Sequence, residues 1–145
     1  MKISTKGRYG LRAMIDIAQD VSNKPVSIKD IAKRQDVSDI YLEQVFSVLK
    51  KAKLVKSIKG AGGGYLLAAH PKEISVGEVL KELEGDLSII EMDSEVKCEI
   101  QAFLYENLWQ EINKRIHRLM NETTLQELID DYESNKNEAR TMYYI

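Results

Sequence analysis

The chain has 145 residues, 43% of them hydrophobic and 30% charged, which fits one domain or one small domain with an appendage and excludes a large multidomain enzyme. No apolar run approaches the roughly 20 residues that cross a bilayer, and the basic N-terminus lacks the apolar region of a secretory signal, so we expect a cytoplasmic protein. The single cysteine, Cys98, excludes an internal disulfide and a metal site made of cysteines alone.

The net charge of −2 hides a division along the chain. Residues 1–60 carry 13 lysines and arginines against 6 acidic residues, whereas residues 61–145 carry 8 against 17. A basic front half joined to an acidic back half is expected when one end of a protein faces a polyanion. Two ordinary solvated surfaces would give the same numbers, so the order of the elements has to decide.

Three helices are predicted in the first part of the chain. Apolar residues at a spacing of three and four predict a helix that Thr5 caps and that ends near residue 23. Ser27 opens a short helix that stops near Arg34, and Ser38 opens a third helix after a three-residue break. The third helix is expected to bury one apolar face, made of Leu42, Val45, Phe46 and Leu49.

A hairpin and a fourth helix follow. Residues 54–59 and 65–68 have the pattern of two strands, and the glycine-rich residues 60–64 predict the turn between them, because glycine adopts positive φ. Ser75 and Glu78 form a capping box that opens a fourth helix, which ends at Gly85.

The back part of the chain is predicted to be mostly helical. Residues 86–96 have no clear period and indicate a loop. Residues 97–120 predict a long helix with apolar residues at steps of four, and its apolar surface is broad enough to need a partner. Thr124 caps a short helix that ends near Tyr132, and the polar residues 135–140 are expected to be mobile.

This order of elements is the layout of a winged helix-turn-helix. We therefore predict a mainly α fold with a small β-hairpin wing. Residues 1–84 would form the DNA-binding domain, and residues 85–145 the linker, the long helix, the short C-terminal helix and the tail. The third helix would enter the major groove, with Tyr41, Glu43 and Gln44 at the base edges and Ser38 at a phosphate. The alternative is an ordinary solvated helix face.

The glycine-rich turn lacks both nucleotide-binding fingerprints. Tyr65 stands where the last glycine of G-x-G-x-x-G belongs, and no Gly-Lys-Ser/Thr follows for a P-loop. A glycine-rich tip with Lys59 at its entry is better suited to close approach to a DNA backbone or minor groove.

Several linked motifs resemble the Rrf-two family of bacterial transcription regulators. They lie at residues 1–9, 41–44, 59–60, 63–67 and 74–78, and the likeness extends through Trp109 and residues 123–125. The resemblance implies a dimeric repressor that binds a partly palindromic operator. The candidate DNA-binding residues are Lys6, Arg8, Tyr9, Ser27, Ser38, Tyr41, Glu43, Gln44, Lys59, Gly60 and Gly62. The implied dimer is joined by the long helix, at Leu104, Leu108, Ile112 and Ile116.

Within that family, the wing residue that matches Lys59 enters the minor groove, and in many members it is arginine. Members that sense iron-sulfur clusters or nitric oxide carry three cysteines between the fourth helix and the long helix. Here one of these positions matches Cys98, while the others appear as Met92 and near Phe103, and Glu106 stands where some members have a histidine ligand. One thiolate and one carboxylate make a poor cluster site, so we expect no cofactor and treat Cys98 as an ordinary or redox-reactive thiol.

The two ends of the chain are similar to the cysteine-poor branch of the family, which represses cysteine metabolism. This similarity implies a partner enzyme, O-acetylserine sulfhydrylase, which would bind Tyr144 and Ile145 by capturing the terminal carboxylate. The alternative is that the tail covers the protein's own surface.

We do not expect an enzyme, because no paired carboxylates, nucleophile with a base, or ligand cluster stands out. Two alternatives to the cysteine-metabolism repressor stay open. One is a redox-responsive or iron-sulfur-responsive regulator of the same family. The other is a winged-helix module that has lost DNA binding and contacts proteins instead.

Overall fold

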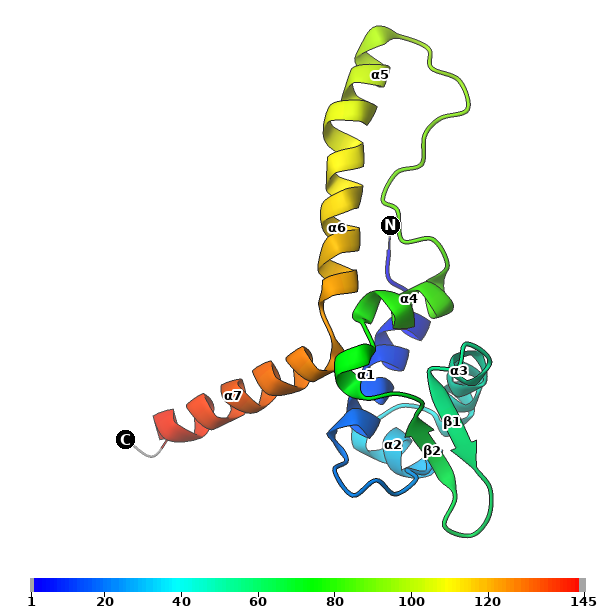
Figure 1. The fold of residues 1–145 in the computed structure, drawn as a ribbon, viewed down its shortest axis with the longest axis vertical. Helices are drawn as coiled ribbons and strands as arrows, with labels where there is room; N and C mark the ends of the chain where they lie inside the picture. Colours follow the sequence, from blue (N-terminus) through cyan, green and yellow to red (C-terminus); the bar gives the residue numbers. More distant parts are fainter. Residues whose placement is uncertain (1, 144–145) are drawn as a thin grey trace.

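The computed structural model describes residues 2–143. It contains a winged helical domain from which two helical segments project (Figure 1). The elements are α1 (Thr5–Gln19), α2 (Ile28–Gln35), α3 (Asp39–Lys51), β1 (Val55–Ile58), β2 (Gly64–Leu67), the 3-10 turn η1 (Pro71–Glu73), α4 (Val76–Glu84), α5 (Glu99–Leu104), the π-helical segment η2 (Tyr105–Trp109), α6 (Gln110–Glu122) and α7 (Leu125–Tyr143). The predicted mainly α fold with a hairpin wing is confirmed.

Serine side chains start three of the helices where the sequence predicts them. The hydroxyls of Ser27 and Ser38 accept hydrogen bonds from the N–H groups of Asp30 and Tyr41, which are the third residues of α2 and α3. Ser75 and Glu78 form the reciprocal capping box of α4, and α4 ends at Gly85, which has a φ of 86°. These caps satisfy N–H groups that no intrahelical carbonyl reaches.

Helix α1 differs from the prediction at both ends. Its cap is Ser4 rather than Thr5, and the Ser4 hydroxyl accepts the N–H of Gly7 at 3.4 Å. It ends at Gln19 rather than near residue 23, because the Asp20 carboxylate accepts the N–H of Ser22 in a local turn. Such a turn competes with continuation of the helix.

The main core lies where α1, α2, α3, α4 and the wing meet. All four residues predicted for the apolar face of α3 are at most 1% exposed, which confirms that face. They pack with Met14 and Ile17 of α1, Ile31 of α2 and Val79 of α4. Leu125, the first residue of α7, is also fully buried in this core, so α7 starts inside the winged domain.

The wing is an antiparallel hairpin that is tied to the rest of the domain. Its register runs from Val55 opposite Leu67 to Ile58 opposite Gly64. Val26, in the segment before α2, exchanges two backbone hydrogen bonds with Tyr65, at 2.9 and 2.8 Å. At Gly64, where φ is 153°, a Cβ would lie 2.3 Å from the Val26 carbonyl oxygen, so this close approach requires glycine.

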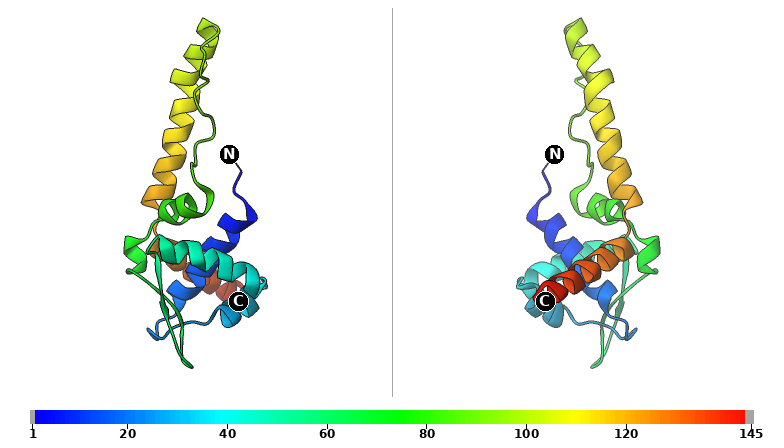
Figure 2. Two further views of the ribbon diagram at one scale, coloured as in Figure 1. Left: turned by 90° about the vertical axis from the view of Figure 1, so that its right-hand side faces the viewer. Right: turned by 90° about the vertical axis from the view of Figure 1, so that its left-hand side faces the viewer.

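Helices α5 and α6 and the segment η2 form one long helix that projects from the winged domain, with the C-terminal end of α6 packed against α4 (Figures 1 and 2). It confirms the long helix predicted for residues 97–120 but contains a π-helical turn that the sequence did not indicate. Apolar residues at steps of four move by about 40° per step around the axis of an α-helix. A π turn contains more residues per turn than an α turn and therefore reverses part of this rotation.

The C-terminal helix is much longer than predicted. Instead of ending near Tyr132, α7 continues to Tyr143, so residues 135–140 are helical rather than a mobile tail. The reason is that residues 125–143 contain no glycine or proline to stop the helix. Residues 130–142 are exposed, and Figure 1 shows α7 projecting away from the domain. Tyr144 and Ile145, the predicted partner-binding residues, lie outside the described residues.

Candidate nucleic-acid interface

The polar face of α3 is turned outward. Glu43 and Gln44 are exposed, and Tyr41 is half-buried, while their neighbours in sequence form the core. Because residues one or two apart point to different sides of a helix, the four buried residues of α3 determine which side chains face solvent. The three residues predicted to read bases are therefore carried on one short stretch of a helix that the core holds firmly.

The start of α3 already satisfies part of its own first turn. The Ser38 hydroxyl accepts the N–H of Tyr41 at 3.4 Å, and the Asp39 carboxylate accepts the N–H of Ile40 at 2.9 Å. Ser27 is used in the same way at the start of α2. These two serines, both predicted to contact DNA, are thus occupied by helix capping in the free protein.

An aromatic contact brings α1 to the start of α3. The rings of Tyr9 and Tyr41 meet edge to face, with 5.9 Å between their centroids. The Arg12 guanidinium lies 5.1 Å from the centre of the Tyr9 ring and donates a hydrogen bond to the Gln35 carbonyl oxygen. Arg12 was not predicted as part of this surface, because its hydrogen-bond partner, Gln35, lies 23 residues further along the chain at the end of α2.

The other basic residues of α1 lie nearer its N-terminus. Lys6 is half-buried, and Arg8 is exposed and donates to the Thr5 hydroxyl at 3.2 Å. Both lie within the first turn and a half of the helix. They are therefore on the N-terminal side of the contact between Tyr9 and Tyr41.

The wing tip offers open space. Lys59, Gly60 and Gly62 are exposed, and a Cβ built on either glycine would have no neighbour within 4 Å. Gly63 differs, because a Cβ there would lie 2.2 Å from the Ile58 carbonyl oxygen. The turn itself therefore requires Gly63, whereas no contact within the domain explains why residue 62 lacks a side chain.

An ion pair between a buried carboxylate and a half-exposed guanidinium fixes α2 against α1. Arg34 donates two short hydrogen bonds to Asp16, Nη2 to Oδ1 at 2.7 Å and Nε to Oδ2 at 3.0 Å, and Gln35 donates a third at 2.8 Å. The Asp16 side chain is only 5% exposed, whereas that of Arg34 is 51% exposed. The hydrogen bond to Asp16 raises the pKa of Arg34 above its usual value. This pair was not predicted, and it holds the last turn of α2 against α1, just before the break that leads into α3.

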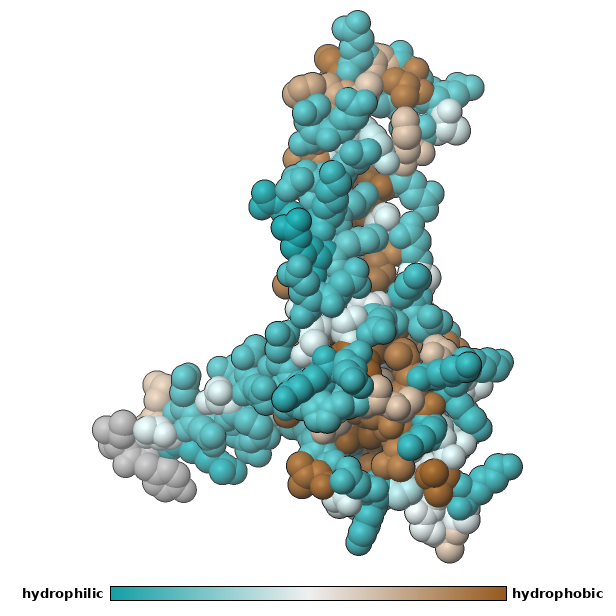
Figure 3. All heavy atoms as spheres, in the orientation of Figure 1, coloured by the Kyte–Doolittle hydropathy of each residue, from teal (hydrophilic) through white to brown (hydrophobic). Residues whose placement is uncertain are grey.

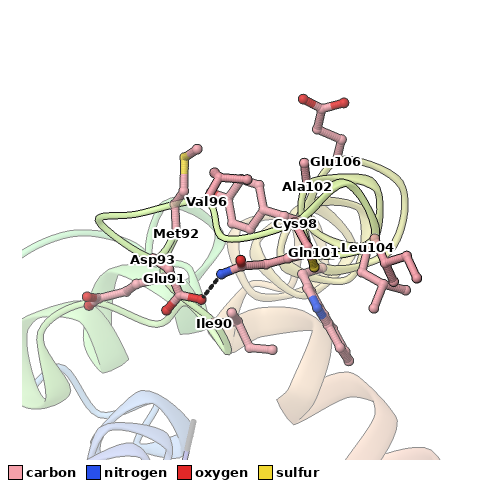
Figure 4. Close-up of a pocket in the computed structure, with 13 residues that line it drawn as sticks. Ile90, Glu91, Met92, Asp93, Val96, Cys98, Gln101, Ala102, Leu104 and Glu106 are labelled. Atoms are coloured by element: carbon pink, nitrogen blue, oxygen red, sulfur yellow. Dashed lines mark hydrogen bonds between the residues drawn. The ribbon is translucent and has the colours of Figure 1, made fainter.

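The linker folds back onto the long helix. The Asn113 side chain accepts the N–H of Ile89 at 2.7 Å and donates to the Ile90 carbonyl oxygen at 2.9 Å. Beyond this point the linker and the start of the long helix enclose a pocket of about 370 Å³ (Figure 4). Its lining is mostly apolar and includes Cys98, which is exposed at the start of α5.

The donor atoms around Cys98 do not fit an iron-sulfur cluster. Figure 4 shows the side chains of Met92 and Glu106 directed away from the Cys98 thiol. Phe103, near the third cysteine position, is 61% exposed and offers no donor atom. Within residues 2–143 no three His, Cys, Asp or Glu side chains are grouped so that they could hold a metal ion.

The long helix carries an apolar surface that the described residues 2–143 leave partly exposed. Leu104 and Leu108 are 37% and 41% exposed, Ile112 and Ile116 are half-buried, and no residue of 99–122 is fully buried. Hydrophobic residues gather around the α5 end, whereas the visible side of α6 and α7 is mostly hydrophilic (Figure 3). None of the helices in residues 2–143 has the length and apolarity to span a membrane.

These features define a winged helix-turn-helix protein with an outward-facing third helix, a glycine-tipped wing and a long projecting helix whose apolar residues are partly exposed. The family model described as "Rrf2: Iron-dependent Transcriptional regulator" matches residues 3–131. The chain therefore belongs to the Rrf2 family of transcriptional regulators. This is the same family, written Rrf-two above, that the sequence motifs resemble.

Several members of the family are similar over most of their length. The chain is 41% identical to the HTH-type transcriptional regulator CymR of Bacillus subtilis over all of both proteins. It is 40% identical to IscR of Vibrio atlanticus over 92% of this chain and 78% of that protein.

Solved structures of the family agree with the fold. The structure of CymR, the global cysteine regulator of B. subtilis, matches with a TM-score of 0.80 and 41% identity, over 90% of this chain and 97% of that one. An oxidised form of CymR from Staphylococcus aureus matches with a TM-score of 0.72 and 38% identity, over 89% and 96% of the two chains.

Proposed function

We propose that this protein is a homodimeric repressor that binds a partly palindromic operator and controls genes of cysteine or sulfur metabolism. The observation that carries the DNA-binding proposal is the face of α3, which exposes Glu43 and Gln44 opposite four buried residues. Its identity of 41% to a global cysteine regulator supports the metabolic assignment. The protein would act in the cytoplasm as a regulator rather than as an enzyme.

The base-reading step follows from the chemistry of the exposed side chains. In the major groove a glutamate accepts a hydrogen bond from a cytosine amino group, and a glutamine pairs with both edge atoms of an adenine. Glu43 and Gln44 would supply these two contacts. Tyr41, held by Tyr9, would lie at the edge of the same surface.

The remaining contacts would position the protein on the duplex. Lys6 and Arg8 of α1 would neutralise phosphates, and Lys59 would follow the wing tip into the minor groove. Gly60 and Gly62 would allow the wing backbone to approach the DNA, because neither position has a side chain or a neighbouring group in the way. Ser27 and Ser38 would act mainly by presenting the capped helix starts to phosphates.

The long helix would join two copies. A two-fold dimer places two recognition helices about one helical turn of DNA apart, which matches a palindromic operator. Leu104, Leu108, Ile112 and Ile116 would lie in the shared seam, where their exposed apolar surface would be covered.

Glu43→Ala and Lys59→Ala are expected to weaken operator binding in different ways. Loss of Glu43 should relax discrimination at one base pair by about 1–3 kcal/mol, with little change in affinity for random DNA. Loss of Lys59 should weaken binding to all sequences and reduce the salt dependence by about one unit. Binding titrations on operator and random duplexes at several salt concentrations distinguish the two effects.

Equal losses on operator and random DNA in Glu43→Ala would contradict base reading by Glu43. An unchanged salt dependence in Lys59→Ala would contradict its phosphate contact. If the parent protein binds no duplex DNA at all, the protein-interaction module is the correct function.

We infer that Cys98, rather than a cluster, is the redox-sensitive group if this protein responds to oxidation. The donor set around Cys98 does not suit an iron-sulfur cluster, since such centres are held mainly by cysteines. Cys98 is an exposed thiol, and exposure is one requirement for a thiol that peroxide oxidises.

We propose, from the resemblance, that the C-terminus binds O-acetylserine sulfhydrylase. Deletion of Tyr144 and Ile145 is expected to abolish the complex and to leave the dimer and its own affinity for DNA unchanged. The physical reason is that the terminal carboxylate and an isoleucine side chain are a known unit of peptide capture. Calorimetry with the purified enzyme checks this, and O-acetylserine should compete with the full-length chain. Equal affinity for full-length and truncated protein would exclude capture of the tail.

A further inference from the structure

The N-terminus of α1 is closed by a carboxylate from a distant helix. Glu84 is the last residue of α4, and its Oε1 accepts three hydrogen bonds, from Ser4 N at 2.9 Å, Ser4 Oγ at 2.6 Å and Gly7 N at 3.0 Å. Ser4 is the cap of α1, and Gly7 lies in its first turn. A carboxylate in this place satisfies free N–H groups and complements the positive end of the helix dipole.

The space for this carboxylate exists because residue 7 is glycine. A Cβ at Gly7 would lie 2.2 Å from Glu84 Oε1, so any other residue would displace the end of the glutamate side chain. Glycine within a helix is less favourable than alanine. The contact with Glu84 therefore explains the presence of a glycine at this position.

The turn that Glu84 holds carries two of the proposed DNA contacts. Lys6 precedes Gly7 and Arg8 follows it, and Tyr9, one residue further on, contacts Tyr41 of α3. The residues of α3 are fixed by the core. The first turn of α1 is fixed instead by the Ser4 cap and by Glu84.

Glu84 also lies where α4 meets the linker. Gly85 ends α4, and Leu87 is buried in a second cluster with Val76 and Leu80 of α4. Ile3, just before α1, and Met120 of the long helix pack against this cluster. The contact between Glu84 and α1 is therefore next to the place where the N-terminal segment, α4 and the long helix come together.

We propose that Glu84 is a positioning residue for DNA binding, which holds the first turn of α1 so that Lys6 and Arg8 meet DNA phosphates. This inference rests on the proposed DNA-binding function. Glu84 contributes through the geometry of α1 rather than by touching DNA. A charge effect alone would have the opposite sign, because removing a carboxylate near a polyanion strengthens binding.

The test compares three variants with the full-length parent. Glu84→Ala is expected to weaken operator binding about three- to tenfold and to lower the salt dependence by about one unit, because a phosphate contact is lost. Gly7→Ala should have the same effect while keeping the helix, since its methyl group displaces the carboxylate. Glu82→Ala, an exposed residue of α4, removes the same charge without touching α1 and should leave binding unchanged or slightly tighter.

A double-mutant cycle separates positioning from general stability. In an Arg8→Ala and Lys6→Ala background, Glu84→Ala should have little further effect on DNA affinity, because the groups that it positions are absent. Glu84→Gln keeps an acceptor oxygen and should recover part of the loss. Full additivity in the cycle, or tighter binding by Glu84→Ala, would overturn the proposal.

Amide hydrogen exchange separates this proposal from the proposed function. In Glu84→Ala the amides of Ser4 and Gly7 should exchange about fivefold faster, with or without DNA-binding activity. Faster exchange with unchanged DNA affinity and salt dependence would overturn the positioning role alone. A parent that binds no duplex DNA would overturn the proposed function and this role with it.

Discussion

Leu108→Glu is expected to convert the proposed dimer into a folded monomer. In the single chain Leu108 is 41% exposed, so a glutamate at this position can be solvated, and glutamate is a good helix former. In a dimer seam the same carboxylate would be buried without a partner, at a cost of roughly 3–4 kcal/mol, which raises the dimer dissociation constant by about two to three orders of magnitude. Sedimentation equilibrium measures this constant, and circular dichroism checks that the helix remains.

Lys114→Ala is the matched control for this variant. It changes the net charge by the same one unit, and it lies on the far side of the helix from Ile112 and Ile116, because residues two apart are separated by about 200°. Leu108→Glu should also lose most of its operator affinity, since a monomer contacts only one half-site. A folded Leu108→Glu that still sediments as a dimer would place the seam elsewhere.

Arg34→Ala is expected to lower the free energy of unfolding by about 2–4 kcal/mol. Arg34 is half-exposed, so the ion pair itself contributes little through its charges. The cost arises because Asp16 stays buried and keeps only the hydrogen bond from Gln35. Urea unfolding of the parent and the variant measures the difference.

Two further variants test this explanation. Lys33→Ala removes an exposed cation from the same turn of α2 and should change stability by less than about 0.5 kcal/mol. Asp16→Asn in the Arg34→Ala background removes the buried charge and should recover much of the lost stability. If Arg34→Ala is as stable as Lys33→Ala, Asp16 does not depend on its partner in the way proposed.

Local signals explain which parts of the fold were predictable. The starts of three helices are each marked by capping residues within a stretch of four residues: Ser27, Ser38, and Ser75 with Glu78. The buried residues of α3 recur with the period of a helix. The length of α7 was missed because a polar stretch of weak helix formers resembles a tail, although it contains no glycine or proline that would end the helix. The π turn in the long helix has no sequence signature of this kind.

The candidate site was predictable only in part, for a related reason. Glu43 and Gln44 follow from the helical period of α3, and the glycines of the wing follow from the demands of a turn. The groups that support them come from distant parts of the chain. Arg34 pairs with Asp16, 18 residues away, and Glu84 caps α1 from 80 residues away, so no local pattern reveals either contact.

The two hydrogen bonds between Val26 and Tyr65 have a consequence for the choice of DNA sequence. They anchor the wing to the segment before α2, so the separation between the wing tip and α3 is set before DNA arrives. In the proposed DNA complex, a protein built in this way would measure the distance from a major groove to the neighbouring minor groove. That distance varies with the width and bendability of the base pairs between them, which differ between A-tracts and flexible pyrimidine–purine steps. Base pairs that no side chain touches would thus contribute to operator preference through the shape of the DNA.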